Sequence, residues 1–259
     1  MTRYTGNGAY GYANSIYMAL RGSGAAAAEL PEPGFIECLT TMPFGTLYLR
    51  VGRDLLVYFS SPLATPDQGI TTALDALGWE CRAEREGAPE AALARLAEAA
   101  GRGPVLAGPL DMGGLGYMPH HAQLSGSDHF VVVLGVENDR VRIHDPEGYP
   151  YAALPTAEFL RAWKADRVRY AQVPYTMRTG FRHVRHPARE EMIARYEDKS
   201  GRSMSALNWY QALALWKAAV FMEGNYKRFQ AGSSDDEYLG LFDRGVPMLA
   251  EKAREIAHS

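Results

Sequence analysis

The sequence predicts an α+β fold in which an antiparallel sheet packs against helices and is followed by an all-α tail. Between residues 104 and 154, short apolar or alternating runs are separated by tight-turn residues, which is typical of antiparallel strands. Apolar residues at helical spacing precede this region, for example over 88–101. At about residue 178 the composition changes to almost purely helical patterns. We therefore predict an α+β domain at 1–178 and a helical tail at 179–259.

The composition is that of an ordinary globular protein. The chain has 259 residues, 47% hydrophobic and 22% charged, with a net charge of -3. A nucleic-acid-binding protein usually carries a basic excess, so nucleic acid is not an expected partner. No apolar run approaches the roughly 20 residues that span a bilayer, and the start lacks the regions of a signal peptide. With only two cysteines, Cys38 and Cys81, we expect a cytoplasmic protein that does not bind membranes.

Helical spacing and turn signals place the elements of the first half. Four helices are expected, at 10–22, 35–42, 67–77 and 88–101. Glycines at 22 and 24 end the first of them. The runs LYLRV and LLVYF, on either side of a turn at 52–54, predict a hairpin.

The centre of the chain predicts the sheet. The expected strands are PVLAGPLDMG (104–113), FVVVLGVE (130–137), RVRIHDP (140–146) and YPYAAL (149–154). A glycine-rich loop over 113–126 separates the first two, and Asn138-Asp139 forms the turn after the second. A short helix at 155–163 and a last strand at 167–178 complete the domain.

The tail predicts three helices, at 189–201, 206–232 and 246–257. We expect its large apolar residues to pack as a core: Trp209, Leu213, Leu215, Trp216, Val220 and Phe221. Asp235, Asp236 and Glu237 are expected in a solvated loop or at a helix N-terminus.

His129 and Asp145 are the best candidates for chemistry. His129 opens a buried strand and Asp145 ends the next one, so a short hairpin would bring the two side chains to the same end of the sheet. A carboxylate there would orient the imidazole and fix its tautomer, as a base in nucleophilic catalysis requires. The structural alternative is that His129 caps a strand and Asp145 starts an Asp-Pro turn.

These residues resemble the His and Asp half of papain-like cysteine enzymes. The stretch His-Phe-Val-Val-Val-Leu-Gly-Val, a hairpin and His-Asp-Pro-x-Gly are similar to bacteriocin-processing peptidases and to the N-terminal domain of the butirosin biosynthesis H protein. Four further segments resemble the same butirosin-type family: YTGNGAYGYANSIYMAL, IECLTTMPFG, PDQGITTALDALGW and GPVLAGPLDMG. The resemblance covers about 1–178.

The resemblance implies a papain-like fold and a cysteine nucleophile at the N-terminus of the first helix, where the helix dipole and an imidazole lower its pKa. His129 would be the base and Asp145 its orienter. The implied chemistry is acyl transfer or amide hydrolysis through a thioester. In the butirosin enzyme the acyl group passes from a carrier protein to an aminoglycoside amine, so a small-molecule amine or acyl substrate and an acyl carrier protein are expected partners.

The sequence departs from the family at the nucleophile. Gly11 stands in Gly-Ala-Tyr-Gly-Tyr-Ala-Asn-Ser, where the family pattern has cysteine. Three explanations stand: an engineered knock-out, a natural pseudoenzyme that binds a metabolite or a carrier arm, or a pocket that uses His129 and Asp145 without a nucleophile. In the third case Tyr10 or Tyr12 would act with His129 in non-covalent acid/base catalysis.

Other polar residues near Gly11 are weaker candidates, each with a structural alternative. Asn7 and Asn14 would supply an oxyanion-hole amide, and Ser15, one turn beyond Gly11, would face the same side. Cys38 is expected as a small buried side chain in the second helix, and Cys81 in a strand distant from the site.

No cofactor or metal is expected. Six possible metal ligands lie close together in the sequence: His120, His121, Asp128, His129, His144 and Asp145. However, the side chains of adjacent residues point apart along an extended chain, and the ligand spacing of a zinc site is not present. The glycine-rich stretches match neither phosphate-loop pattern. MGGLGYMP is expected as a loop beside the His129 strand whose aromatic and Met residues could line a substrate pocket.

The tail has a resemblance of its own. Residues 188–257 look like the C-terminal helices of aminoglycoside phosphotransferase-like kinases, but no His-Gly-Asp catalytic loop or ATP-binding lobe precedes them. Kinase activity is therefore not implied. The remaining roles are a packing module, a substrate lid or the surface of a homodimer.

Overall fold

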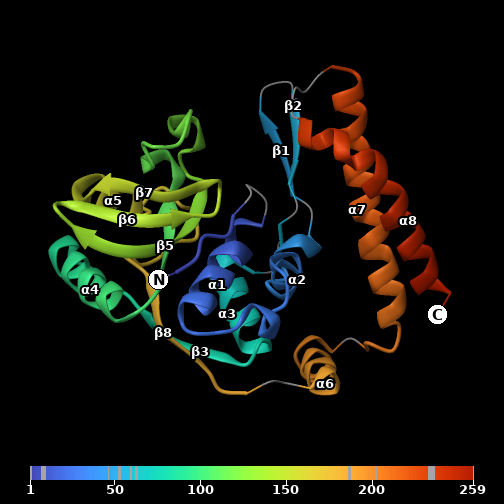
Figure 1. Ribbon diagram of the computed structural model, residues 1–259, viewed down its shortest axis with the longest axis horizontal. Helices are drawn as coiled ribbons and strands as arrows, with labels where there is room; N and C mark the ends of the chain where they lie inside the picture. Colours follow the sequence, from blue (N-terminus) through green and yellow to red (C-terminus); the bar gives the residue numbers. More distant parts are fainter. Residues whose placement is uncertain are drawn as a thin grey trace. The chain divides into compact units, whose positions relative to one another are not determined.

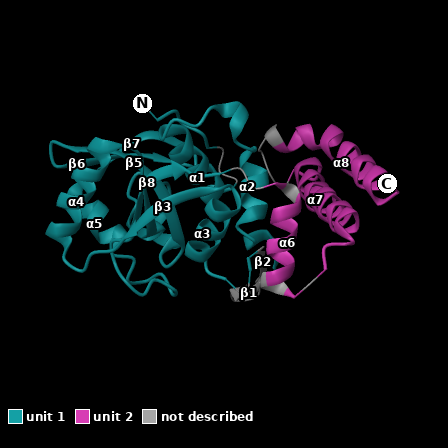
Figure 2. Cartoon of the chain, turned by 90° about the horizontal axis from the view of Figure 1, so that it is seen from below, with its two compact units in different colours: residues 1–187 teal, residues 188–259 magenta. Residues whose placement is uncertain are grey.

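The structure is a computed structural model, which describes residues 2–6, 10–45, 47–51, 54–58, 60–61, 64–185, 188–201, 203–232 and 237–258 (Figure 1). The chain divides into two compact units, Met1–Pro187 and Ala188–Ser259, coloured separately in Figure 2. Every helix in the described part of the chain is too short or too polar to cross a lipid bilayer.

The first unit is built on a six-stranded sheet in which every neighbouring pair is antiparallel. The strands, in spatial order, are β3 (Trp79–Glu84), β8 (Met177–His183), β4 (Val105–Asp111), β5 (Asp128–Glu137), β6 (Arg140–Asp145) and β7 (Tyr149–Pro155). The predicted antiparallel sheet is therefore confirmed. Three neighbouring strands, β5, β6 and β7, follow one another directly in the chain because tight turns join them.

Helices cover both faces of this sheet. They are α1 (Gly11–Gly22), α2 (Pro33–Leu39), α3 (Pro66–Ala76), α4 (Pro89–Arg102) and α5 (Thr156–Trp163) (Figure 1). The first three pack in one core with Phe130 and Val132, and the last two pack in a second core with Val131 and Val133. Alternate residues of β5 thus point into two different apolar layers, which explains its continuous apolar run.

A separate two-stranded sheet and several short helical turns complete the first unit. The strands β1 (Leu47–Val51) and β2 (Asp54–Tyr58) pair antiparallel, which confirms the predicted hairpin. Its turn includes residues 52 and 53, which lie outside the described residues. Short 3-10 turns occur at Ala27–Glu29, Met42–Phe44, Met112–Gly114 and His121–Leu124.

The predicted last strand at 167–178 is wrong. Residues 166–176 form turns and irregular chain, and the strand in this place is β8, over Met177–His183. Left-handed backbone at Ala165 and Tyr175 turns the chain, so Val168 and Tyr175 are buried without belonging to the sheet. The predicted domain boundary at 178 consequently falls inside β8, whereas the two compact units meet after Pro187.

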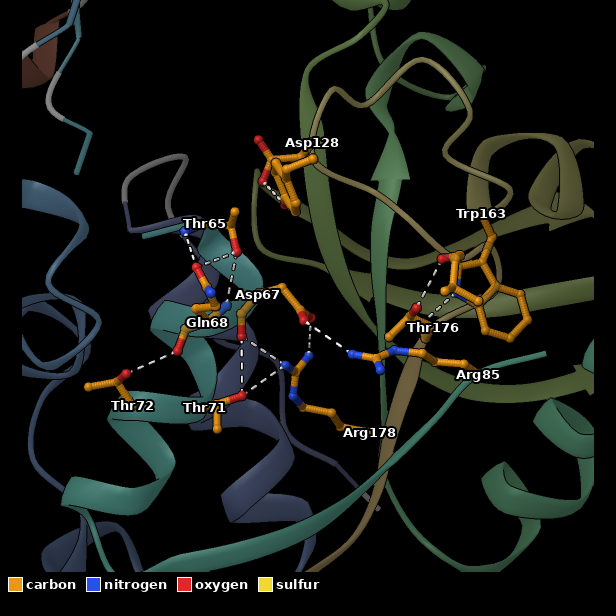
Figure 3. A network of polar contacts seen from close by, with 12 residues as sticks. Thr65, Asp67, Gln68, Thr71, Thr72, Arg85, Asp128, Trp163, Thr176 and Arg178 are labelled. Carbon is orange, nitrogen blue, oxygen red and sulfur yellow. Dashed lines mark hydrogen bonds and ion pairs between the residues drawn. The ribbon is translucent and has the colours of Figure 1, made fainter. Parts of the chain in front are cut away.

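A buried arginine connects β8 to α3. Arg178 is 2% exposed, and its Nη2 donates to the Asp67 carbonyl at 2.8 Å and to the Thr71 hydroxyl at 3.1 Å. Its Nη1 lies 2.8 Å from Asp67 Oδ1, an ion pair without hydrogen-bond alignment. Arg85 approaches the same carboxylate at 3.9 Å, so two cations face Asp67 (Figure 3). A buried guanidinium requires such compensation.

The second unit consists of α6 (Arg189–Ser200), α7 (Leu207–Gln230), a 3-10 turn at Glu237–Leu241 and α8 (Phe242–Ala257). The predicted acidic residues 235 and 236 lie outside the described residues. The helices α7 and α8 pack against each other, and the residues buried in them are alanines: Ala212, Ala219 and Ala253.

The expectation of a large apolar core in the tail is wrong for four of its six residues. Trp209, Trp216, Val220 and Phe221 are each more than half exposed. Small side chains allow the two helix backbones to approach closely, so α7 turns its alanine face to α8. The larger residues therefore lie outside the helix contact.

Two glycines in helices provide a test of the packing. A Cβ on Gly69 in α3 would lie 2.7 Å from the Thr40 carbonyl oxygen, which belongs to backbone, whereas a Cβ on Gly101 in α4 would meet nothing within 4 Å. We expect Gly69→Ala to lower the free energy of unfolding by roughly 1–3 kcal/mol. Gly101→Ala should raise it by up to about 1 kcal/mol, because alanine favours helix. Urea unfolding followed by circular dichroism measures both; equal effects would contradict the close approach of α3 to residue 40.

Candidate active site

His129 and Asp145 meet at one end of the β5–β6 hairpin. His129 lies at the start of β5 and Asp145 at the end of β6, and the antiparallel register pairs Val132 with His144. His129 Nε2 lies 2.9 Å from Asp145 Oδ1, and the two residues are 4% and 0% exposed. The structure thus brings together the two residues that the spacing predicts to be neighbours.

Asp145 is held in its ionised form by several donors. The Tyr117 hydroxyl donates to its Oδ2, and the backbone N–H of Glu147 donates to its Oδ1 at 2.8 Å. Burial raises the pKa of the Asp145 carboxyl, but the hydrogen bond and charge of His129 and the Tyr117 hydroxyl bring the pKa below its ordinary value of 3.8. The Tyr4 hydroxyl donates to the Asp145 carbonyl at 3.1 Å and fixes the backbone.

Asp145 also determines the state of the imidazole. Burial lowers the pKa of His129, but the hydrogen bond and charge of Asp145 outweigh it, so that the pKa lies above 6.5. Because Nε2 faces Asp145, Nδ1 is the nitrogen available to a reacting group, and it has no hydrogen-bond partner among the described residues.

Gly11 begins α1 beside this pair. The Ser15 hydroxyl, one turn further along α1, donates to the Phe130 carbonyl at 2.8 Å, which ties the helix to the residue after His129. Among the described residues, a Cβ built on Gly11 would meet Glu147 Oε1 alone, at an ordinary contact distance of 3.5 Å. The nucleophile position of the resemblance is therefore open, and its backbone accepts a side chain.

Glu147 is the site residue that the sequence analysis missed. It follows Asp145 in the β6–β7 turn, and its carboxyl reaches the open space at Gly11. Burial raises its pKa, the charge of His129 lowers it and Asp145 raises it; the pKa lies above 4.5. No lysine or arginine in the described residues pairs with Glu147. The available signal was an acid two residues after Asp145, directly behind Pro146, because an Asp-Pro turn folds back on itself.

Tyr12 is directed away from the imidazole, contrary to its expected role as an acid for His129. Its hydroxyl donates to Asp128 Oδ2 at 2.9 Å, and the Tyr170 hydroxyl donates to the same oxygen at 2.8 Å. Burial, followed by the charge of Asp128, raises the pKa of Tyr12 well above 10.0. Its ring packs edge-on against Phe130, with centroids 5.6 Å apart, so Tyr12 anchors α1 to β5.

The remaining candidates near Gly11 are structural or peripheral. Ser15 is fully buried and its hydroxyl is used by the Phe130 carbonyl, so it does not face the open space as expected. Asn14 is 2% exposed within α1, and Tyr10 is half exposed with left-handed backbone before the helix. Asn7 lies outside the described residues.

A further carboxylate reaches the first turn of α1 from α2. Burial raises the pKa of Glu37 to about 7, although the nearby backbone N–H of Ala13 lowers it. Both Glu37 and Glu147 also raise the pKa of Tyr12 through their charges, which places them around the same helical turn. The positive end of the helix dipole favours negative groups there.

Neither cysteine is an activated thiol. Cys38, expected to be buried, is exposed on α2, and Cys81 is partly buried in β3. Although Cys38 lies at the surface, the protein atoms around each sulfur exclude part of the solvent, and this desolvation, ahead of any charge, raises the pKa of both thiols above 9.0. A reactive cysteine requires the opposite shift.

The histidines and acids considered as metal ligands have other contacts. His144 lies on β6 next to Asp145, with Nε2 against the Thr2 carbonyl and Nδ1 accepting from the Tyr151 N–H. His121 Nδ1 contacts the Gly113 carbonyl at 2.7 Å. In the part of the chain that the structure describes, no three His, Cys, Asp or Glu side chains converge on one point.

The glycine-rich loop after β4 is closed at its base and delivers Tyr117. Asp111 Oδ1 accepts from the backbone N–H groups of Gly113 and Gly126, both at 2.9 Å. This carboxylate therefore joins the two ends of the loop, and Tyr117 between them reaches Asp145. The expected loop beside the His129 strand is present.

Replacing Asp145 should change the titration of His129. In Asp145→Asn burial would still lower the pKa of the imidazole, while the charges of Glu147 and Asp128 but no longer that of Asp145 would raise it, so we expect the pKa to fall. Nitrogen-detected NMR of the histidine rings measures the shift. The exposed Asp166→Asn variant is the matched control and should leave the His129 titration unchanged.

The same pair should make stability depend on pH. Because folding raises the pKa of His129, protonation of this ring stabilises the folded state. The contribution is fully present below pH 6.5 and is lost as pH rises through the folded-state pKa of His129. Because folding lowers the pKa of Asp145, ionisation of this carboxyl also stabilises the folded state. The contribution is fully present above pH 3.8 and is lost as pH falls through the folded-state pKa of Asp145. The destabilisation by Asp145→Asn, measured by urea unfolding, should therefore be largest at pH values between the two folded-state pKa values, that of Asp145 and that of His129. A pH-independent difference would contradict an ion pair.

Comparison with known proteins shows a similarity to a protein of unknown activity. No family model matches the chain. The chain is similar to the uncharacterized protein YobF of Bacillus subtilis (strain 168), with 35% identity over 171 residues. The match covers 66% of this chain and 53% of YobF, so the chain spans about half the length of this relative.

Proposed function

We propose that this chain is an acyl-transfer enzyme with a papain-like pocket, in which His129 moves protons and Asp145 holds the imidazole. The observation that carries the proposal is the buried contact of 2.9 Å between His129 Nε2 and Asp145 Oδ1. It leaves Nδ1 available beside the N-terminus of α1. A carboxylate-oriented imidazole next to such a helix end suits the chemistry of acyl groups.

The order of the parts supports a papain-like assignment. An N-terminal helix offers the nucleophile position, a central antiparallel strand carries the histidine and the next strand carries the acid. Tyr117 and the Glu147 N–H stabilise that acid from outside the pair. This is the support that a catalytic imidazole needs in order to keep one orientation.

The absence of a side chain heteroatom at residue 11 favours direct transfer. The two cysteines of the chain have raised pKa values, and Cys38 is exposed on α2. The acyl group would therefore pass straight from an ester or thioester donor, such as a carrier-bound thioester, to an amine or water. The open space at Gly11 would hold the acceptor.

Restoring a cysteine at residue 11 tests the pocket. In Gly11→Cys we expect a thiol pKa at least about 1 unit below the free value of ~8.5, because the helix dipole and the imidazole stabilise a thiolate. The rate of alkylation by iodoacetamide as a function of pH measures it. The variant should also be acetylated by S-acetyl-N-acetylcysteamine, as counted by mass spectrometry.

The unmodified chain is the matched control, since it contains Cys38 and Cys81 but no thiol at residue 11. Adding His129→Ala to Gly11→Cys should return the thiol pKa to about 8.5. A thiol that titrates near that value whether or not His129 is present would refute the papain-like pocket and would favour a binding role for this site.

A further inference from the structure

The Glu147 carboxyl is not used to hold the fold together. The residue stabilises Asp145 through its backbone N–H, a contact that any residue except proline would make. Its side chain pairs with no lysine or arginine among the described residues, and its Oε1 lies 3.5 Å from the Cβ position of residue 11. A partly buried carboxyl without a structural partner is costly, which points to a role in the pocket.

Two carboxylates in different environments, Asp145 and Glu147, interact with the His129 imidazole. Asp145 is fully buried and receives three donors, from His129, Tyr117 and the Glu147 N–H. Glu147 is less buried, and its charge interacts with His129 from the side of Gly11. Asp145 is therefore suited to hold the ring, while Glu147 is free to exchange a proton with a bound molecule.

We propose that Glu147 is the general base of the reaction and activates the attacking group in the space that Gly11 leaves open; this inference rests on the acyl-transfer function proposed above. The Glu147 carboxylate removes the proton of the amine or water as its N or O bonds to the acyl carbon. His129, as imidazolium, donates its Nδ1 proton to the leaving group as the old bond breaks. The proton on Glu147 then returns to His129, which restores both groups.

The charge states fit this assignment of roles. Glu147 must be ionised and His129 protonated, so activity requires a pH above the pKa of the first and below the pKa of the second. His129 lowers the pKa of Glu147, and Glu147 and Asp145 raise that of His129. Burial acts in the opposite direction on both groups, so the mutual charge interaction is what favours the active combination. Among the described residues, the other titratable groups around the pair are Tyr4, Tyr12, Glu37, Tyr117, Asp128 and Asp145.

Hydrolysis of two neutral esters by the full chain tests the proposal. p-Nitrophenyl acetate has a leaving group that needs no proton, whereas trifluoroethyl acetate has a more basic one. We expect Glu147→Ala to reduce kcat/KM for both esters by roughly 100-fold and to remove the acidic limb of the pH profile. His129→Gln should reduce the rate with trifluoroethyl acetate by roughly 100-fold and affect p-nitrophenyl acetate less.

Added sodium formate should restore the Glu147→Ala rates, because it supplies a carboxylate in the vacated space. Glu137→Ala, which removes an exposed glutamate of β5, is the matched control and should behave as the unmodified chain. In the Gly11→Cys chain, Glu147→Gln should lower the thiol pKa by about 0.5–1 unit, because a nearby negative charge is lost. This last measurement needs no turnover.

The outcomes separate the two proposals. If His129→Gln slows hydrolysis while Glu147→Ala does not, or if formate fails to restore activity, Glu147 is not the base and the acyl-transfer proposal stands. If neither variant differs from the unmodified chain, both the acyl-transfer function and the role of Glu147 as general base are refuted. An unchanged thiol pKa in Gly11→Cys with Glu147→Gln would overturn the placement of Glu147 at the site.

Discussion

The buried ion pair between His129 and Asp145 is the constraint on which the site depends. Two ionisable groups in a low-dielectric interior are stable only if each is compensated, and the surrounding elements supply that compensation. The loop after β4 delivers Tyr117, the β6–β7 turn delivers a backbone N–H, and the N-terminal segment delivers the Tyr4 hydroxyl. Three separate parts of the chain therefore converge on Asp145: Tyr117 and the Glu147 N–H donate to its carboxylate, and Tyr4 donates to its backbone carbonyl.

The antiparallel hairpin makes this convergence possible. The start of β5 and the end of β6 are adjacent because the strands run in opposite directions and are joined by a two-residue turn at Asn138-Asp139. α1 is then anchored to the same end of the sheet by Tyr12 and Ser15. The polar contacts that fix the helix also determine where residue 11 lies relative to the imidazole.

Local patterns predicted the strands β4 to β7 and the proximity of His129 and Asp145, because β5, β6 and β7 pair with their neighbours in the chain. The strand at 167–178 failed because buried residues in a turn, such as Val168 and Tyr175, imitate a strand pattern. Glu147 was missed because its approach to Gly11 joins two segments far apart in the sequence; its place behind Pro146 indicates a turn but not this contact. In the tail, helical periodicity identified the helices but not which face α7 turns to α8, since alanines rather than tryptophans form the contact.

The backbone at residue 11 has an implication for how this site can change through mutation. Gly11 is an ordinary first residue of a helix, with neither a positive φ nor a close backbone neighbour that would demand glycine. The described part of the fold therefore accepts a Cβ at residue 11. A lineage carrying this sequence could gain or lose a cysteine side chain there by one substitution while the imidazole, its acid and their supports stay intact. Under the proposed function, covalent and non-covalent versions of the site would then be one mutation apart.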